Sequence, residues 1–180
     1  MLTTTNNRLE TDFYTLPAYE AAPKLLGKLL CRNLDGKQIK LIINETECYY
    51  GENDSACHAY KGKTERTKVM YENGGLAYIY LCYGRHNMLN IVTGVKDFPE
   101  AVLIRGAGEF NGPGKLTNAL KIDRRLNWEN LITSDNLWIE DDGLKCSYVT
   151  DRRVGIAYAL EVDRNRLWRF IKNYDYLIST

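Results

Sequence analysis

The sequence predicts an α+β fold: a single domain around a mainly antiparallel, curved β-sheet, flanked by helices and carrying a protruding β-hairpin. Two observations predict it. Apolar or alternating runs of strand length recur along the chain, whereas helical spacing of apolar residues is confined to two regions. The length of 180 residues is enough for one sizeable core, and we expect one domain over residues 1–180 with loosely ordered ends at 1–10 and 173–180.

The first element is helical, because apolar residues recur at helical spacing over residues 11–30, and Thr11 or Asp12 can cap its start. Pro17 and Pro23 are expected to divide this region into two short helices. Strands then follow at 39–48, 76–83, 87–93 and 100–106, with a helix at 115–122 and further strands at 136–140 and 144–149. Residues 164–170 are expected to close the fold as a turn or a strand.

The composition argues against several classes of protein. With 44% apolar and 26% charged residues the chain is ordinary globular, and it shows neither a membrane-spanning run nor a signal-peptide core, so we expect a cytoplasmic protein with no membrane partner. The five cysteines are odd in number and lack C-x-x-C spacing, so we expect no disulfide framework, and with only two histidines we expect no metal site. No cofactor is expected. Because the net charge is only +1, nucleic-acid binding has to rest on local basic clusters.

Glu45, Glu47 and Tyr49 follow a short apolar run and share one face of the expected strand. On residue type alone, the two acids simply meet solvent where the strand leaves the core. The alternative is that at least one of them lies in a pocket wall, because a partly buried carboxylate is costly unless it is paired or used. A carboxylate beside an aromatic ring can activate water next to a flat ligand, and His58 is close enough along the chain to return to the same pocket.

Two apolar strands flank Tyr83-Gly84-Arg85, which predicts a β-hairpin with Tyr83 near its tip. Tyr78 and Tyr80 share one face of the first strand, where core packing with a satisfied hydroxyl explains them well. That explanation is weaker for Tyr83, because a hairpin tip has little core to pack against. An exposed ring beside Arg85 can instead enter a DNA groove as a wedge between bases.

Asn90 and Arg105 are polar residues within apolar runs, and two interpretations stay open. Asn90 bonds the backbone and Arg105 pairs with a buried acid, or both line the same pocket as Glu47. A buried arginine needs a partner, and Glu47 would serve.

The segment 58–68 carries a cluster of basic residues with glycine, threonine and an aromatic interleaved. Most such runs are solvated loops, but this pattern is also typical of loops that give phosphates side-chain and backbone donors. The segment 112–117 lacks the spacing of a P-loop, so nucleotide hydrolysis is not supported.

Together these residues carry a family resemblance. The chain resembles the alkyladenine (3-methyladenine) DNA glycosylases of base excision repair over roughly residues 10–170. No single motif is diagnostic, but their order and spacing together are highly specific. The matching segments are Glu45-Thr46-Glu47-Cys48-Tyr49, His58-Ala59-Tyr60, Thr64-Glu65-Arg66-Thr67, Tyr78 to Gly84, Leu89-Asn90-Ile91, Val102-Leu103-Ile104-Arg105, Gly112 to Leu116, Arg153-Val154-Gly155-Ile156 and Trp168-Arg169-Phe170.

The resemblance implies roles at the reacting centre. Glu47 falls at the position of the general base that activates the attacking water, and Glu45 becomes its support. Arg105 and the backbone carbonyl of Val154 resemble the groups that help hold that water.

The resemblance also implies contacts to the substrate. The family stacks the flipped base at the positions of Tyr49, His58 and Tyr80, where His58 also offers a hydrogen bond. Asn90 falls where a side chain disfavours the exocyclic amine of normal guanine, and Tyr83 matches the wedge that replaces the extruded nucleotide. The expected contacts to the DNA backbone are Lys61, Lys63, Thr64, Arg66 and Arg85. The departures from the family pattern, which bear on phosphate contacts more than on chemistry, are Cys48, His86 and the lack of a proline within 63–68.

By this resemblance, the protein is expected to be a monomeric, monofunctional enzyme acting on double-stranded DNA that contains damaged purines. It would hydrolyse the N-glycosidic bond of alkylated or deaminated purines with an activated water. No lysine falls at a matched catalytic position, so we expect no Schiff base and no strand cleavage. Cationic bases stacked on Tyr49 and Tyr80 are expected to gain cation–π attraction. The alternatives are a non-catalytic damaged-DNA-binding module of the same fold and, less favoured, a carbohydrate glycosidase using Glu45 and Glu47.

Overall fold

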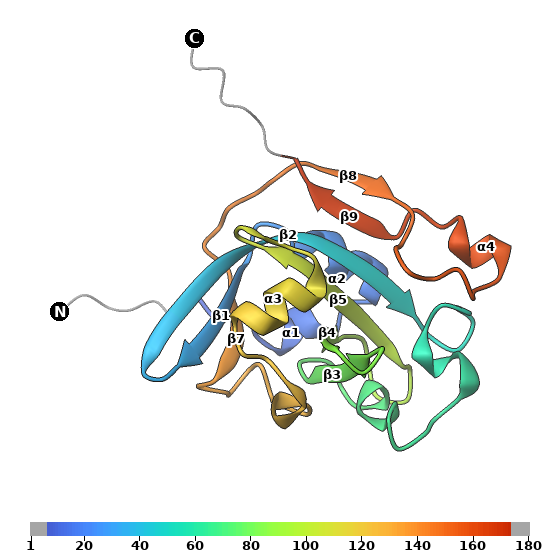
Figure 1. Cartoon of the computed structure of the whole chain (residues 1–180), viewed down its shortest axis with the longest axis horizontal. Coiled ribbons are helices and arrows are strands. Elements are labelled where there is room, and N and C mark those ends of the chain that lie inside the picture. The colour runs from blue at the N-terminus through green and yellow to red at the C-terminus, as the bar shows by residue number, and fades with distance from the viewer. Residues whose placement is uncertain (1–6, 174–180) are drawn as a thin grey trace, which may run out of the picture.

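A curled antiparallel sheet dominates the structure, which is a computed structural model describing residues 7–173 (Figure 1). The expected loose order of residues 1–6 and 174–180 therefore lies outside the described residues. Within that part of the chain nine strands join one sheet, with the order β3-β4-β5-β2-β1-β7, while β6 pairs with β5, and β9 pairs with β2 and β8. The bounds are β1 Leu29–Leu34, β2 Lys37–Tyr50, β3 Ala77–Cys82, β4 His86–Val92, β5 Glu100–Ala107, β6 Phe110–Asn111, β7 Leu137–Glu140, β8 Tyr148–Asp151 and β9 Arg169–Lys172. The α+β class and the curved antiparallel sheet predicted from the sequence are confirmed.

The longest strand, β2, links the two halves of the sheet. Its first part pairs with β1, and its second part lies between β5 and β9. The pairing with β5 shifts register on both sides of Glu45, which marks a β-bulge at the point where the strand passes from one half to the other. Bulges re-aim side chains and are frequent beside active sites. The residues of β2 beyond the bulge, from Thr46 to Tyr50, carry the central part of the candidate site.

The expected helical region 11–30 is wrong at its end, because residues 29–34 form β1. The turn between β1 and β2 is Asp35-Gly36, and both residues have positive φ (52° and 78°). Asp-Gly is the dipeptide favoured in two-residue hairpin turns, so this signal was present in the sequence. The apolar pair Leu29-Leu30 continues the apolar pattern of the preceding helix, although it begins a strand.

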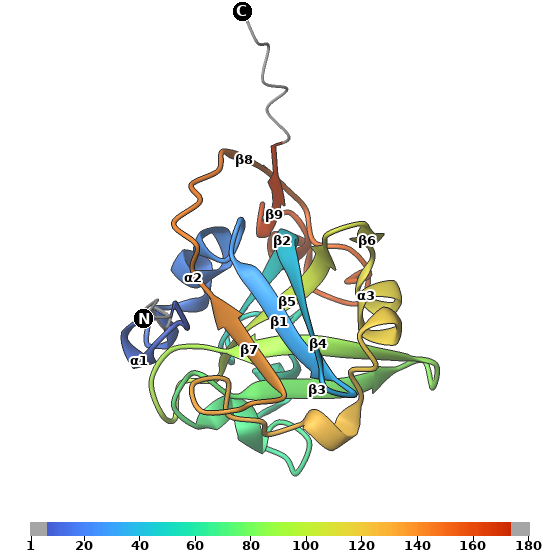
Figure 2. The ribbon, with the colours of Figure 1, turned by 90° about the vertical axis from the view of Figure 1, so that its left-hand side faces the viewer.

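Helices flank the sheet on two sides (Figure 2). The helices α1, Thr11–Tyr14, and α2, Ala18–Lys24, lie on one side, and α3, Pro113–Ala119, lies on the other. Pro17 separates α1 from α2 as expected, whereas Pro23 lies inside the last turn of α2 and does not divide it. Between helices and sheet, Leu25, Ile43 and Ile104 are fully buried. Each such side chain stabilises the fold by about 1.5–3 kcal/mol relative to its exposed state.

The β3–β4 hairpin predicted from the sequence is confirmed. Its strands pair in register from Ala77↔Ile91 to Cys82↔His86. The turn holds Tyr83 and Gly84 at positive φ (48° and 69°), and the Arg85 N–H donates to the carbonyl of Cys82 over 3.0 Å. The Tyr83 side chain is 90% exposed, so the hairpin tip presents an unpacked ring.

The C-terminal third departs most from expectation. The strand expected at 144–149 is displaced to β8, and residues 142–147 form no regular element. The segment 164–170 is divided between the end of α4, Glu161–Arg164, and the start of β9, so the strand interpretation holds for its last residues.

Short 3-10 helices occupy His58–Lys61, Lys68–Tyr71 and Arg124–Leu126. Residues 7–10 run beside β7, where Leu9 is buried and its N–H donates to the carbonyl of Ile139.

Candidate active site

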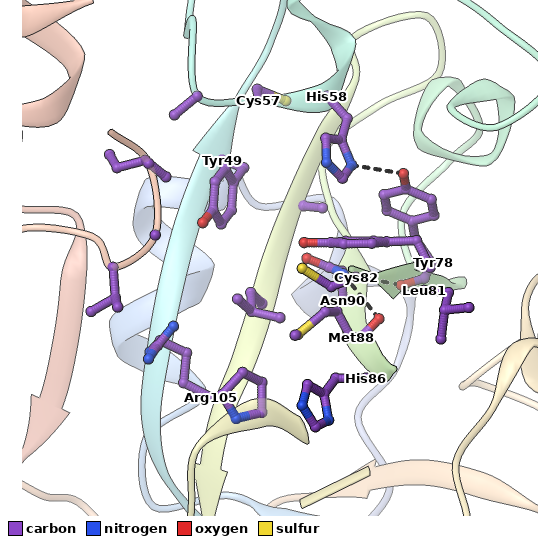
Figure 3. A pocket seen from close by; sticks show the side chains of 18 of the residues that line it. Tyr49, Cys57, His58, Tyr78, Leu81, Cys82, His86, Met88, Asn90 and Arg105 are labelled. Carbon is purple, nitrogen blue, oxygen red and sulfur yellow. Dashed lines mark hydrogen bonds between the residues drawn. The ribbon is translucent and has the colours of Figure 1, made fainter. Parts of the chain in front are cut away.

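A cavity of about 390 Å³ opens between β2, β5 and the β3–β4 hairpin. Two loops close it from the other side, one contributing residues 56–58 and Arg66 and the other contributing residues 154–158. Figure 3 shows Tyr49 on one wall, with His58 and Tyr78 across the cavity and Arg105 toward one end. This volume lies within the range of pockets that bind small ligands.

Glu47 lies directly behind the wall of this cavity and is fully buried. Its Oε1 accepts the N–H of Val154 at 2.7 Å and lies 3.5 Å from Nη1 of Arg105, and its Oε2 accepts the hydroxyl of Tyr49 at 2.9 Å. All three of these partners line the cavity. A carboxylate has about four acceptor sites, and two hydrogen bonds occupy two of them, so room remains for a further donor such as water.

Burial raises the pKa of Glu47 above the ordinary glutamate value, although Arg105, the Val154 amide and the Tyr49 hydroxyl all act in the opposite direction. A carboxylate with a raised pKa is a stronger base than one in solvent. This shift is what a general base near neutral pH requires.

Arg105, on β5, connects the two acids of β2. Its Nε donates to Oε1 of Glu45 at 2.9 Å, and the same Glu45 oxygen lies 3.4 Å from Arg169 on β9. Of the two partners open from the sequence, Glu45 is the closer and Glu47 the second. Glu45 therefore holds Arg105 while Arg105 reaches Glu47, which agrees with a supporting role for Glu45.

The opposite wall is aromatic. The rings of His58 and Tyr80 meet edge to face with centroids 4.5 Å apart, and those of Tyr78 and Tyr80 are tilted with centroids 5.4 Å apart. The Nδ1 of His58 lies 2.9 Å from the hydroxyl of Tyr78. Tyr49 provides the facing ring, so a flat ligand can enter between aromatic walls.

Arg66 reaches the same aromatic wall. Its guanidinium lies 4.9 Å from the centroid of Tyr80, and its Nη2 lies 3.3 Å from Nε2 of His58. A guanidinium can only donate, so Nε2 accepts and the ring proton lies on Nδ1, from which it is donated to Tyr78. Burial, reinforced by the charge of Arg66, lowers the pKa of His58 to about 4. His58 is consequently neutral at physiological pH.

A buried pair, Arg153 and Asp54, fixes the loop that carries Val154. Both guanidinium nitrogens of Arg153 contact the carboxylate of Asp54, at 2.5 and 2.8 Å, and one also donates to the carbonyl of Cys48. The same guanidinium lies 4.9 Å from the Tyr49 ring centroid. Sequence reasoning gave neither residue a role. No local pattern could have paired them, because they lie 99 positions apart.

Asn90 is buried at the base of the cavity, on β4. Its Nδ2 donates to the carbonyls of Tyr78 and Met88, at 3.2 and 3.3 Å. Both interpretations from the sequence are therefore partly right, because Asn90 bonds the backbone and also lines the cavity. With the amide group held by two carbonyls, the side-chain oxygen is the group left to meet a ligand.

The expected DNA contacts divide into two groups. Tyr83 lies at the cavity rim, and Arg85 lines a neighbouring hollow between the hairpin and α3, together with Lys115, Lys121 and Arg125. Lys61, Lys63 and Thr64 are exposed on the loop after His58 and do not line the cavity. Arg66, expected with them, faces the cavity instead.

Nothing in residues 7–173 provides a cluster of three or more histidine, cysteine or acidic side chains placed to hold a metal ion. Among these same residues no helix is long and apolar enough to cross a membrane.

Comparison with known proteins places these features in a family. The profile of methylpurine-DNA glycosylases matches residues 12–110 and 107–175. The chain belongs to this family. A relative from Borreliella afzelii is 46% identical over 175 residues, which cover 90% of this chain and 94% of the relative. One from Methanocella arvoryzae is 44% identical over 183 residues, 90% of each chain, and one from Clostridium perfringens is 39% identical over 194 residues, 91% of this chain and 94% of its own. All three are provisionally named 3-methyladenine DNA glycosylases.

Membership in the methylpurine-DNA glycosylases confirms the resemblance seen in the sequence. The structure brings most of the predicted site residues to one cavity, with Glu47 immediately behind its wall. For Val154 the sequence predicted a role of the carbonyl, whereas the contact described here is made by its N–H. The individual roles of these residues stay predictions.

Proposed function

We propose that this methylpurine-DNA glycosylase flips alkylated or deaminated purines out of double-stranded DNA and hydrolyses their N-glycosidic bond, which initiates base excision repair. The observation that carries the proposal is the carboxylate of Glu47, which is fully buried and is held by two hydrogen-bond donors and the guanidinium of Arg105, all three from residues that line one aromatic cavity. The names of the relatives support 3-methyladenine as one of the bases released.

Base flipping is the first step. Extrusion of a purine costs a few kcal/mol, and less when damage has weakened its pairing. The exposed Tyr83 ring at the hairpin tip can fill the gap left in the duplex, while the cavity offers Tyr49 and the His58–Tyr80 wall to the base. Base–aromatic stacking is worth about 1–3 kcal/mol per base and offsets the extrusion.

Hydrolysis follows at the sugar. A water held at a free acceptor site of Glu47 attacks the C1′ carbon, and Glu47 takes the proton of that water as the new O–C1′ bond forms. The C1′–N9 bond breaks and its electron pair stays with the purine. A cationic alkylated purine leaves as a neutral base, whereas an uncharged purine takes one proton from solvent water as it leaves.

The protein is proposed to act as a monofunctional glycosylase without strand cleavage. Schiff-base formation needs an amine at the sugar, and among residues 7–173 no lysine lines the cavity. We further propose a monomer in the cytoplasm. Its five free thiols suit a reducing compartment.

The two rival functions have less support. A carbohydrate glycosidase typically stacks sugars on tryptophan, but among the described residues none of the three tryptophans lines the cavity. In addition, Glu45 and Glu47 both contact Arg105, so neither is free as an acid partner of the other. A non-catalytic binding module has no need for a buried carboxylate with a raised pKa.

The decisive experiment replaces Glu47 by Gln. Glutamine keeps the shape of the side chain but cannot take a proton from water, so base release should fall by about 10²–10⁴-fold while binding to lesion DNA persists. Release is measured as free base from a duplex oligonucleotide in single turnover.

Glu45→Gln is the matched control, because it removes the charge of the neighbouring acid and weakens the hold on Arg105 and Arg169 while Glu47 stays intact. The loss of base release in Glu45→Gln should be much smaller than the loss in Glu47→Gln. If Glu47→Gln retained near-normal release while Glu45→Gln abolished it, Glu45 would be the base. Release of reducing sugar in place of free base would reject the glycosylase function itself.

A further inference from the structure

Three guanidinium groups surround the cavity, and they differ in how their charge is balanced. Arg105 lies at 2.9 Å from Glu45 and 3.5 Å from Glu47, and Arg153 forms a two-point contact with Asp54. Arg66 forms no ion pair with any carboxylate of residues 7–173. Its partners are instead the imidazole of His58 and the face of Tyr80, so its charge is directed at the place where a base would stack.

Each stacking ring has a guanidinium beside it, but Arg153 is paired with Asp54, whereas Arg66 has no carboxylate partner among residues 7–173. The guanidinium of Arg153 lies 4.9 Å from the centroid of Tyr49, and that of Arg66 lies 4.9 Å from the centroid of Tyr80. The quadrupole of an aromatic ring attracts a cation, but a second cation near the same ring is repelled by the first. The cation–π gain expected from the sequence for a charged base is thereby reduced on the Tyr80 side of the cavity.

The pKa of His58 shows how this aromatic wall affects a positive charge. Its ring lies in the aromatic wall, and its pKa is lowered to about 4 by burial and, second, by the charge of Arg66. A positive charge is therefore disfavoured at this wall even on a side chain that can carry one. A cationic purine stacked against the same ring meets the same two costs.

The charge of Arg66 has the opposite effect on an uncharged purine. When the C1′–N9 bond of such a base breaks, its electron pair moves onto the ring, and negative charge develops on the purine until the solvent proton arrives. A fixed cation near developing negative charge lowers the barrier of that step. Arg66 thus opposes one class of substrate and assists the other.

We propose that this cavity selects uncharged purine lesions, such as deaminated purines, over cationic alkylated purines, and that Arg66 sets this selectivity. The inference rests on the proposed function and assigns the preferred substrate class of the same site. It concerns preference only, so slow release of a cationic base such as 3-methyladenine is compatible with it.

The test is a change of selectivity on removal of the charge. Release of hypoxanthine and of 7-methylguanine is measured in single turnover from otherwise identical duplexes, each corrected for spontaneous loss, for the wild type and Arg66→Gln. We expect the ratio of hypoxanthine to 7-methylguanine release to fall about tenfold in Arg66→Gln, from loss of the first and gain of the second. Arg66→Lys keeps the charge and should restore most of the ratio.

Lys63→Gln is the matched control, because Lys63 is an exposed cation of the same loop that does not line the cavity. It should weaken release of both bases by the same factor and leave the ratio unchanged. If Arg66→Gln behaved like Lys63→Gln, with equal losses and a salt dependence of DNA binding reduced by about one phosphate contact, Arg66 would be a backbone contact and the proposal would be wrong. Release of neither base by the wild type would instead refute the proposed function. Urea-unfolding curves of Arg66→Gln that match those of the wild type would show that this substitution of an exposed residue leaves the fold intact.

Discussion

The two sides of the cavity are built in opposite ways. On the side of Glu47, every charged group is buried or nearly so and is matched by an opposite charge: Arg105 with Glu45, and Arg153 with Asp54. On the rim, Tyr83 is 90% exposed and Arg66 has no carboxylate partner among residues 7–173. The first side is complete before any substrate arrives, as preorganised catalysis requires. The second side is exposed, and its groups are available for contact with a substrate.

The largest effect that would test this contrast is on stability. Arg153→Met should lower the free energy of unfolding by about 3–5 kcal/mol, because it leaves Asp54 buried without its partner and removes the cation beside Tyr49. Urea denaturation measures the change.

Arg166→Met is the control for Arg153→Met. Arg166 stacks on Trp168 and pairs with Asp163, but its side chain is 36% exposed and Asp163 keeps the hydrogen bonds from the N–H and hydroxyl of Ser55, so the expected loss is about 1 kcal/mol or less. Equal losses from the two variants would show that the buried side owes no special stability to its charge matching.

An intermediate effect is expected at the rim. Tyr83→Ala should reduce base release from duplex DNA by about 10–100-fold, in line with the stacking energy of about 1–3 kcal/mol that one ring supplies. Release from single-stranded DNA should change little, because no neighbouring bases need to be held apart.

Thermal unfolding of Tyr83→Ala should match that of the wild type, since the ring makes little contact with the fold. Equal losses of release on duplex and single strands would contradict the wedge role. A clear drop in stability would break the contrast between the fixed side and the open rim.

The smallest effect concerns pH. Because burial raises the pKa of Glu47, its carboxylate takes up a proton at a higher pH than an ordinary glutamate does. Protonated Glu47 cannot accept the proton of water, so the release rate should fall as pH falls through this raised pKa, and its midpoint should lie above the ordinary value of about 4.3. Single-turnover rates of a cationic lesion between pH 4 and 8 measure it. A midpoint at or below the ordinary value would show that the donors around Glu47 outweigh its burial.

Local patterns in the sequence were enough to predict the hairpin and the placement of Glu47 and Tyr49. Strand alternation alone puts these two side chains on one face, and the hydrogen bond between them follows from that geometry. The strand β1 could not be separated from the preceding helix, because Leu29-Leu30 continues the apolar pattern of that helix. Only the Asp-Gly turn that follows indicates a strand in place of a longer helix.

Long-range contacts account for what could not be predicted. Arg153 and Asp54 meet only when the loop after β8 folds over the loop after β2. The position of Arg66 could not be foreseen either, since its loop reads as a solvated basic segment. Its direction depends on where the 3-10 helices place it relative to Tyr80.

The central place of β2 has a consequence for biosynthesis. Glu47 lies on a strand that is synthesised early, yet its neighbours across the sheet include Arg169 of β9, and its hydrogen-bond donors include Val154. While the chain is emerging from the ribosome, the carboxylate lacks these late partners even after the aromatic wall has formed. In the nascent protein the proposed base is therefore incompletely held, and Glu47 acquires its full set of partners only when the C-terminal segment pairs with β2.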